Sequence, residues 1–222
     1  MDRRLILGGI AVAIAGGGLI WKNSTPGSTL IEPVSAASAQ SSDVDTSSIV
    51  EMTMGPQDAK VTVTEYASFT CPHCAHFHQG PFKQMKADYI DTGLIHFIYR
   101  DVYFDRFGLM AAQIARCGGS ERFFGIADML YAQQHDWIAG GDDPAKIVQN
   151  LRKIGKVAGL GDESLDARLA DKDKAEALVA WYNQNAQADN VRSTPSFIIN
   201  GAPYSNMSYD SFKEVIDAKL AE

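Results

Sequence analysis

The chain has 222 residues, 45% of them hydrophobic, so it is long enough to bury its own core as one domain with an insertion. Its formal net charge of −7, without clustered Lys and Arg, excludes a nucleic-acid partner and favours proteins or small molecules. The 3 cysteines are too few for a disulfide-stapled scaffold, which favours a redox-active or metal-binding pair.

The N-terminal segment has the pattern of an export signal. Residues 5–21 are uncharged and mostly apolar, and they follow two arginines. We assign residues 1–22 to a signal peptide or an N-terminal membrane anchor, and both alternatives stay open. Ala37-Ser38-Ala39 has the small-x-small form of a cleavage site, although it lies far from the apolar run. In either case we expect the folded part to be exported.

Residues 23–55 are rich in Ser, Thr, Ala, Pro and Gly without periodicity, so we expect a flexible tether. Gly55-Pro56 is a turn signal, and ordered structure is predicted to begin just after it. Residues 60–69 are rich in Val, Thr, Tyr and Phe and predict a strand. Alternation along this strand places Glu65 on the same side as two valines, so a carboxylate joins an apolar face.

The motif Cys71-Pro72-His73-Cys74 stands where this strand gives way to a helix predicted over residues 75–90. Residues 94–100 predict a second strand. The strand, helix, strand order implies a parallel crossover. The thiols are therefore placed at the N-terminus of the connecting helix.

From residue 104 to 190 the apolar period is helical, and Cys117 continues the apolar stripe of the first helix, which places it in the core. The predicted helices span about 107–117, 123–130, 143–159, 164–169 and 178–189, and Asp143 is the expected N-cap of the third. A hairpin at 196–204 with an Asn200-Gly201 turn and a last helix over 212–220 close the chain.

The two thiols of the motif can divide the work of disulfide exchange. Cys71 lies at the first helical turn, where unpaired N–H groups and the helix dipole favour a thiolate, and His73 can add a donor or a charge. Cys74 is one turn further along and faces inward. We therefore predict Cys71 as the attacking or attacked sulfur and Cys74 as the resolving thiol.

A metal site is the alternative, because the two cysteines with His76 and His78 offer four ligands within eight residues. On a helix the two histidines project about 200° apart, so one ion cannot easily take both. A second ligand pair of the kind that zinc sites draw from a separate segment does not occur in the sequence. Redox exchange is thus favoured, and His76 and His78 are interpreted as a solvated helix face.

Glu65 lies six residues before Cys71 on the apolar side of the first strand. It is either a strand-end residue in water or a buried carboxylate, and alternation alone does not decide burial. A buried carboxyl group could accept the proton that Cys74 loses when it resolves a mixed disulfide, and this is the role we predict.

Thr194-Pro195 precedes the strand of the hairpin, where a proline alone is an ordinary edge feature. Together with the Cys71-Pro72-His73-Cys74 motif at a strand-to-helix junction, it gives a resemblance to the DsbA-like thiol:disulfide oxidoreductases of the thioredoxin superfamily. The resemblance rests on residues 65–74, residues 193–197, the Asn200-Gly201 turn and the helical block between them. It covers most of the chain after residue 55.

The resemblance implies an α/β protein, a thioredoxin fold with an inserted α-helical domain. The thioredoxin-like domain is expected at 56–104 and 174–222, and the helical insertion at 105–173. It also implies a cis Pro195 packed against a redox-active disulfide between Cys71 and Cys74. The backbone at Thr194 would pair with an extended client peptide.

The activity that the resemblance implies is that of a monomeric dithiol oxidase. It would introduce disulfides into reduced exported proteins, and a quinone-linked membrane oxidase of the DsbB type would restore its own disulfide. It implies no organic cofactor or metal and a location in the periplasm, secreted or tethered to the inner membrane. Because Thr194 also occurs before the proline of isomerases and reductases, a disulfide reductase or isomerase stays open, as does a thiol chaperone or metal carrier without net oxidation.

Overall fold

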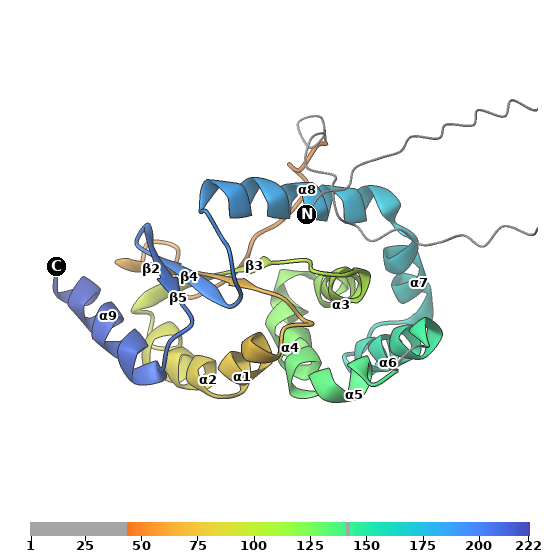
Figure 1. The fold of residues 1–222 in the computed structure, drawn as a ribbon, viewed down its shortest axis with the longest axis horizontal. Coiled ribbons are helices and arrows are strands. Elements are labelled where there is room, and N and C mark those ends of the chain that lie inside the picture. Colours follow the sequence, from red (N-terminus) through yellow and green to blue (C-terminus); the bar gives the residue numbers. More distant parts are fainter. Residues whose placement is uncertain (1–43, 141–142) are drawn as a thin grey trace, which may run out of the picture. The chain divides into compact units, whose positions relative to one another are not determined.

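The structure is a computed structural model that describes residues 44–140 and 143–222. Its strands form one sheet in the order β1-β3-β2-β4-β5 (Figure 1). They are β1 (Met52–Met54), β2 (Val61–Ala67), β3 (Ile95–Asp101), β4 (Ser196–Ile199) and β5 (Ala202–Ser205). Central β2 runs parallel to β3 and antiparallel to β4, so the predicted parallel crossover is confirmed.

Both faces of the sheet are covered by helices (Figure 1). One face carries α1 (Pro72–Gln79), α2 (Pro81–Met85) and α9 (Tyr209–Ala221), and α8 (Lys172–Ala188) lies across the other. Glu65 and Tyr66 are neighbours on β2 and point to opposite faces, yet both are fully buried. A central strand covered on both sides explains why polar residues of β2 are buried as deeply as its valines.

The remaining helices form a block beside the sheet (Figure 1). They are α3 (Arg106–Cys117), α4 (Gly119–Ala132), α5 (Gln134–Ile138), α6 (Pro144–Val157) and α7 (Asp162–Ala170). Asp105 caps α3, and the Asp143 cap predicted for α6 is confirmed, because in each case the carboxylate accepts two backbone N–H groups. The α/β class is confirmed, whereas the predicted domain boundaries stay a prediction. The short helix α5 was not expected.

The helix predicted over residues 75–90 is wrong as one element. α1 ends at Gln79, α2 begins at Pro81, and a π-helical turn, η1 (Lys86–Ile90), follows. Pro81 has no N–H to donate and cannot continue the hydrogen bonds of the preceding helix. The break leaves the thiols on a short helix of 8 residues.

The expected start of ordered structure after Gly55-Pro56 is also wrong, since β1 precedes this turn. Met52 of β1 lies opposite Tyr99 of β3 and is buried. Three residues are too short for a strand period to be visible, so only the pairing with β3 reveals the strand. Gly55 itself has φ of +78°, which fits the predicted turn.

The predicted signal or anchor at residues 1–22 lies outside the described residues, as does most of the expected tether. Within residues 44–140 and 143–222, the structure has no helix long and apolar enough to cross a membrane.

Candidate active site

The two sulfurs of the motif occupy different environments at the start of α1. Cys71 is the N-cap residue, with extended backbone angles of φ −85° and ψ 118°, and Pro72 occupies the first helical turn. Its side chain keeps 8% of its exposure, whereas Cys74, one turn on, is at 0%. This is the arrangement predicted for an attacking and a resolving thiol.

Hydrogen bonds converge on the sulfur of Cys71. The thiol of Cys74 contributes the largest effect, and Thr194 and the backbone N–H groups of Cys74 and His73 add to it. Together they outweigh burial and lower the pKa of Cys71 to about 5. Cys71 is therefore a thiolate at neutral pH.

Cys74 is shifted in the opposite direction. Burial raises its pKa well above the ordinary range, and the hydrogen bond with Cys71 and the charge of Glu65 raise it further. Cys74 therefore remains a thiol at neutral pH. A proton acceptor is needed before Cys74 can act as a nucleophile, because the thiolate is the reactive species.

The loop before β4 lies against the attacking sulfur. The peptide bond between Thr194 and Pro195 is cis, as the resemblance implied. Pro195 is buried, and the Sγ atom of Cys71 lies 3.5 Å from the carbonyl oxygen of Thr194. The structure thus brings together the two motifs that are farthest apart in the predicted site.

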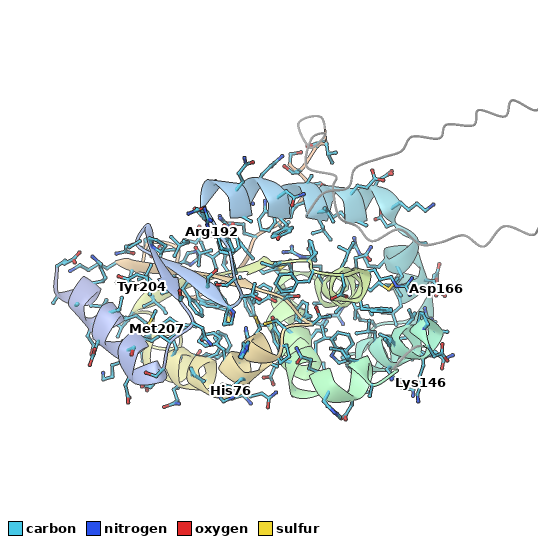
Figure 2. All side chains as sticks on the ribbon, in the orientation of Figure 1. His76, Lys146, Asp166, Arg192, Tyr204 and Met207 are labelled. Atoms are coloured by element: carbon cyan, nitrogen blue, oxygen red, sulfur yellow. The ribbon has the colours of Figure 1, made fainter. Side chains whose placement is uncertain are left out.

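Glu65 is a buried carboxylate, and its partner is His78. Glu65 is 0% exposed, and Nε2 of His78 lies 3.1 Å from its Oε1 and 2.9 Å from its Oε2. The prediction that His78 is part of a solvated face is wrong, since its side chain is 3% exposed. His76 does lie on the exposed side of α1 (Figure 2). The angle of about 200° that separated the two histidines already required one of them to turn inward.

Three residues that support the active-site loop were not identified as functional from the sequence. Nε2 of Gln134, on α5, donates to the carbonyl oxygens of Phe69 and Cys71 at 2.8 and 2.9 Å. The Thr70 hydroxyl donates to the α3 cap Asp105 at 2.7 Å. A single Gln or Thr carries no recognisable signal, whereas Asp105 before a helix start is a cap pattern that could have been noticed.

The imidazole of His73 is exposed, and His73 contacts the sulfur of Cys71 through its backbone N–H. A role for the His73 side chain stays a prediction. Within the described parts of the chain, no group of three or more His, Cys, Asp or Glu side chains could hold a metal ion.

Cys117 lies outside this site, in the helical block. It packs against the core but is half-buried, and its thiol donates to the carbonyl oxygen of Ser164 at 3.7 Å. It lines a cavity of about 380 Å³ between its own helix α3 and the segment that leads into α7. The expected burial is therefore only partial, because the helical stripe that contains Cys117 reaches the edge of the core.

The fold and the site together define a thioredoxin-fold protein with a redox-type cysteine pair. The sequence pattern of the thioredoxin family matches residues 47–218. The chain therefore belongs to the thioredoxin family. The predicted resemblance to its DsbA-like members and the predicted fold are confirmed by the relatives and solved structures that follow.

The relatives carry names from disulfide chemistry. A Rickettsia bellii protein provisionally named a protein-disulfide oxidoreductase is 34% identical over 173 residues, which cover 78% of this chain and 65% of the relative. The chain thus spans less than two thirds of that relative. Disulfide bond formation protein D of Bacillus subtilis is 27% identical over 178 residues, covering 75% of this chain and 76% of the relative.

Solved structures agree with this fold. Oxidised BdbD from Bacillus subtilis is 25% identical, with a TM-score of 0.68 over 78% of this chain and 94% of that one. Alpha-DsbA1 from Wolbachia pipientis is 24% identical, with a TM-score of 0.71 over 77% of this chain and 91% of that one. The second likeness concerns the fold alone.

Proposed function

We propose that the chain is a thiol:disulfide oxidoreductase that works as an exported dithiol oxidase, introducing disulfides into reduced exported proteins. One observation carries the proposal. A low-pKa thiol, Cys71, and a buried high-pKa thiol, Cys74, stand one helical turn apart, with the first against the Thr194 carbonyl. Such asymmetry is what exchange through a mixed disulfide requires.

The proposed reaction begins with a disulfide between the two cysteines. A client thiolate attacks Sγ of Cys71, the bond between the cysteines breaks, and Cys74 leaves and takes up a proton. A second client thiolate then attacks the client sulfur of the mixed disulfide, and Cys71 leaves as a thiolate. The client loses two electrons and the protein gains them, so one disulfide is exchanged for another.

The pKa of Cys71 supports the oxidising direction. A thiol with a pKa of about 5 is mostly ionised at neutral pH, which stabilises the reduced protein. A stabilised reduced form makes the disulfide form a stronger oxidant. A low leaving-group pKa also speeds the second step, in which Cys71 departs.

We also propose the kind of client and the regenerating partner. An extended client segment beside Cys71 could pair with the backbone at Thr194, which lies next to the attacked sulfur. Each turnover leaves the protein reduced, so an oxidant must restore it, and we propose a quinone-linked membrane oxidase of the DsbB type. The protein is proposed to act as a monomer.

The decisive experiment equilibrates the protein with mixtures of reduced and oxidised glutathione and measures the fraction of Cys71–Cys74 disulfide by mass spectrometry. We expect a potential more oxidising than the glutathione couple. A value near that of thioredoxin, about −270 mV, contradicts the oxidase and favours a reductase. Tight stoichiometric zinc binding without exchange would instead favour a metal carrier.

Export is proposed from the apolar residues 5–21 alone. Fractionation of cells that express the full chain tests it. We expect protection from external protease in intact cells and digestion after the outer membrane is opened. N-terminal sequencing of the recovered protein then separates a cleaved signal from a retained anchor.

A further inference from the structure

The Glu65 carboxylate is enclosed by protein. It is 0% exposed, and His78 is its only hydrogen-bond partner among the residues that the structure describes. Its negative charge nevertheless acts on Cys74 and raises the pKa of that thiol. If Glu65 accepts a proton from Cys74, the proton has no direct way to water. Within residues 44–140 and 143–222, His78 is the group placed to receive it.

His78 is held firmly in this position. Its ring stacks on Tyr131, with 4.2 Å between centroids and 14° between planes, and it lies 4.6 Å from the ring of Phe82. Tyr99 lies edge-on at 5.9 Å. The imidazole is thereby fixed against the carboxylate, and its remaining 3% exposure is more than Glu65 retains.

The titratable groups around the pair come from four elements. Cys74 and His78 lie on α1 and Cys71 is its N-cap residue, whereas Glu65 lies on β2, Tyr99 on β3 and Tyr131 on α4. The two tyrosine hydroxyls are 2.6 Å apart, and burial raises both of their pKa values well above the ordinary range. Both tyrosines therefore stay neutral between pH 5 and 9. The two thiols, Glu65 and His78 are the groups of this cluster left to take part in a proton transfer.

We propose that His78 is the positioning residue of the resolving step, and that it orients the Glu65 carboxylate and holds the proton that Cys74 exchanges with it. The inference rests on the proposed function and names the group that moves the proton of Cys74. A histidine suits this task because its ionisation lies near neutral pH.

The proton balance is the same in both directions of exchange. When Cys74 attacks a mixed disulfide, its S–H proton passes to the Glu65 carboxylate, and the carboxyl group then passes it to the unprotonated Nε2 of His78, whose other ring nitrogen, Nδ1, carries the hydrogen of the neutral imidazole. The client sulfur leaves from Cys71 with the electron pair of the broken bond. In the oxidising direction Cys74 is the leaving group, and the proton returns from His78 through Glu65. No reactant beyond client and protein is needed.

The test compares two histidines on one helix. His78→Gln keeps a hydrogen-bonding side chain beside Glu65 but removes the group that can take up a proton, and His76→Gln is the matched exposed control. A disulfide peptide is mixed with each reduced protein, and acid quenching with mass spectrometry separates formation of the mixed disulfide from its resolution by Cys74. Both rates are measured from pH 5 to 9.

We expect His78→Gln to slow resolution about tenfold at pH 7, at the low end of the effects of acid–base groups. The pH dependence of resolution should lose one ionisation, while the rate at which Cys71 attacks stays unchanged. His76→Gln should match the unchanged protein in both steps. Added imidazole should restore part of the rate to His78→Ala, since it can fill the space beside Tyr131.

A second comparison separates a proton role from a packing role. If His78 acts through Glu65, the Glu65→Gln,His78→Gln double variant resolves no more slowly than Glu65→Gln alone. Additive losses, an unchanged pH profile or no rescue by imidazole would overturn the inference. If His78→Gln does not fold, Glu65→Gln with native His78 must lose the same ionisation, and its retention counts against the inference.

Failure of the proposed function gives a different result. The unchanged protein would then exchange no disulfide with the peptide at any pH, and Cys71 would form no mixed disulfide. The inference alone fails when the unchanged protein exchanges normally and both histidine variants behave like it.

Discussion

Two carboxylates of neighbouring strands are buried with basic partners, and the partners differ. Glu65 on β2 pairs with His78, and its charge raises the pKa of Cys74. Asp101, at the end of β3, pairs with Arg116 of α3 at 2.8 Å. Both carboxylates are at most 1% exposed, so burial alone does not distinguish the two pairs.

The two pairs differ in whether a proton can move between the partners. Arg116 stays charged at any pH that the protein meets, so its pair with Asp101 is a fixed connection. Its guanidinium also donates to the backbone of Val50 at 2.8 Å and lies over the rings of Phe123 and Trp181. Arg116 thereby connects the sheet, the segment that precedes β1 and the helical block. A Glu–His pair can instead exchange a proton, and the charge of Glu65 acts on Cys74, the thiol that we propose loses one.

The largest expected effect tests whether Cys74 is the sulfur that needs the proton. Cys71→Ser should lower exchange with a disulfide peptide by about a thousandfold or more, because the nucleophile is lost. Cys74→Ser should instead accumulate mixed disulfides between Cys71 and clients, visible on non-reducing gels. If the Cys74 variant traps nothing, the assignment of attacking and resolving sulfurs is reversed or wrong.

The Asp101–Arg116 pair is expected to matter for stability and not for proton exchange. Arg116→Met should reduce the free energy of unfolding by about 3–5 kcal/mol, since it leaves the Asp101 carboxylate buried without its partner. Lys213→Met, in the exposed pair with Asp217, is the control, with a much smaller loss because solvent screens this pair. Urea titration measures both.

The Arg116→Met and His78→Gln variants also show whether the two pairs differ in the resolving step. Below its unfolding transition, Arg116→Met should keep the pH profile of the resolving step, whereas His78→Gln should not. A profile altered equally by both variants would mean that the Glu65–His78 pair acts only as another structural connection.

The lowered pKa of Cys71 has a consequence for stability that differs between the redox states. The thiol ionises near pH 8.5 in the unfolded chain and near pH 5 in the folded one, so ionisation stabilises the folded reduced protein above pH 5. At pH 7 this amounts to about 2–3 kcal/mol, and it is lost as the pH falls towards 5.

The contribution of Cys74 to the stability of the reduced protein depends on pH in the opposite direction, because its pKa is raised. Its contribution is fully present below about pH 8.5 and is lost at higher pH, where the unfolded chain ionises first. The stability of the reduced protein relative to the oxidised one should therefore rise from pH 5 to about 8.5 and rise no further above it. Paired urea titrations of both redox forms check this, and a pH-independent difference would contradict the low pKa of Cys71.

The smallest effect concerns the support of the active-site loop by α5. Gln134→Ala leaves the carbonyl oxygens of Phe69 and Cys71 without their donor and should cost about 1–3 kcal/mol of stability. We also expect a several-fold slower attack by Cys71, since its backbone is no longer fixed. Gln133→Ala, at the exposed neighbouring position, is the control and should change neither.

Local patterns determined much of this protein. The apolar alternation of residues 60–69, the spacing of Cys71 and Cys74, and the pair Thr194-Pro195 each depend on neighbours within a few residues. A strand-to-helix junction fixes the thiols at a helix start, so their proposed division into attacking and resolving sulfurs could also be predicted from the sequence. The Asn200-Gly201 turn and the Asp143 cap are of the same local kind.

Tertiary structure decided what lies around the sulfurs. His78 faces Glu65 only because α1 packs on the face of β2 that carries this carboxylate, and a helical period alone does not say which histidine turns inward. Gln134 reaches the active-site loop from 63 residues away, through a short helix without an apolar period of its own. The sequence by itself determined where the two thiols stand, since bonding along the chain places them. Packing between distant elements determined their proton partners and supports, because burial and orientation depend on which faces meet.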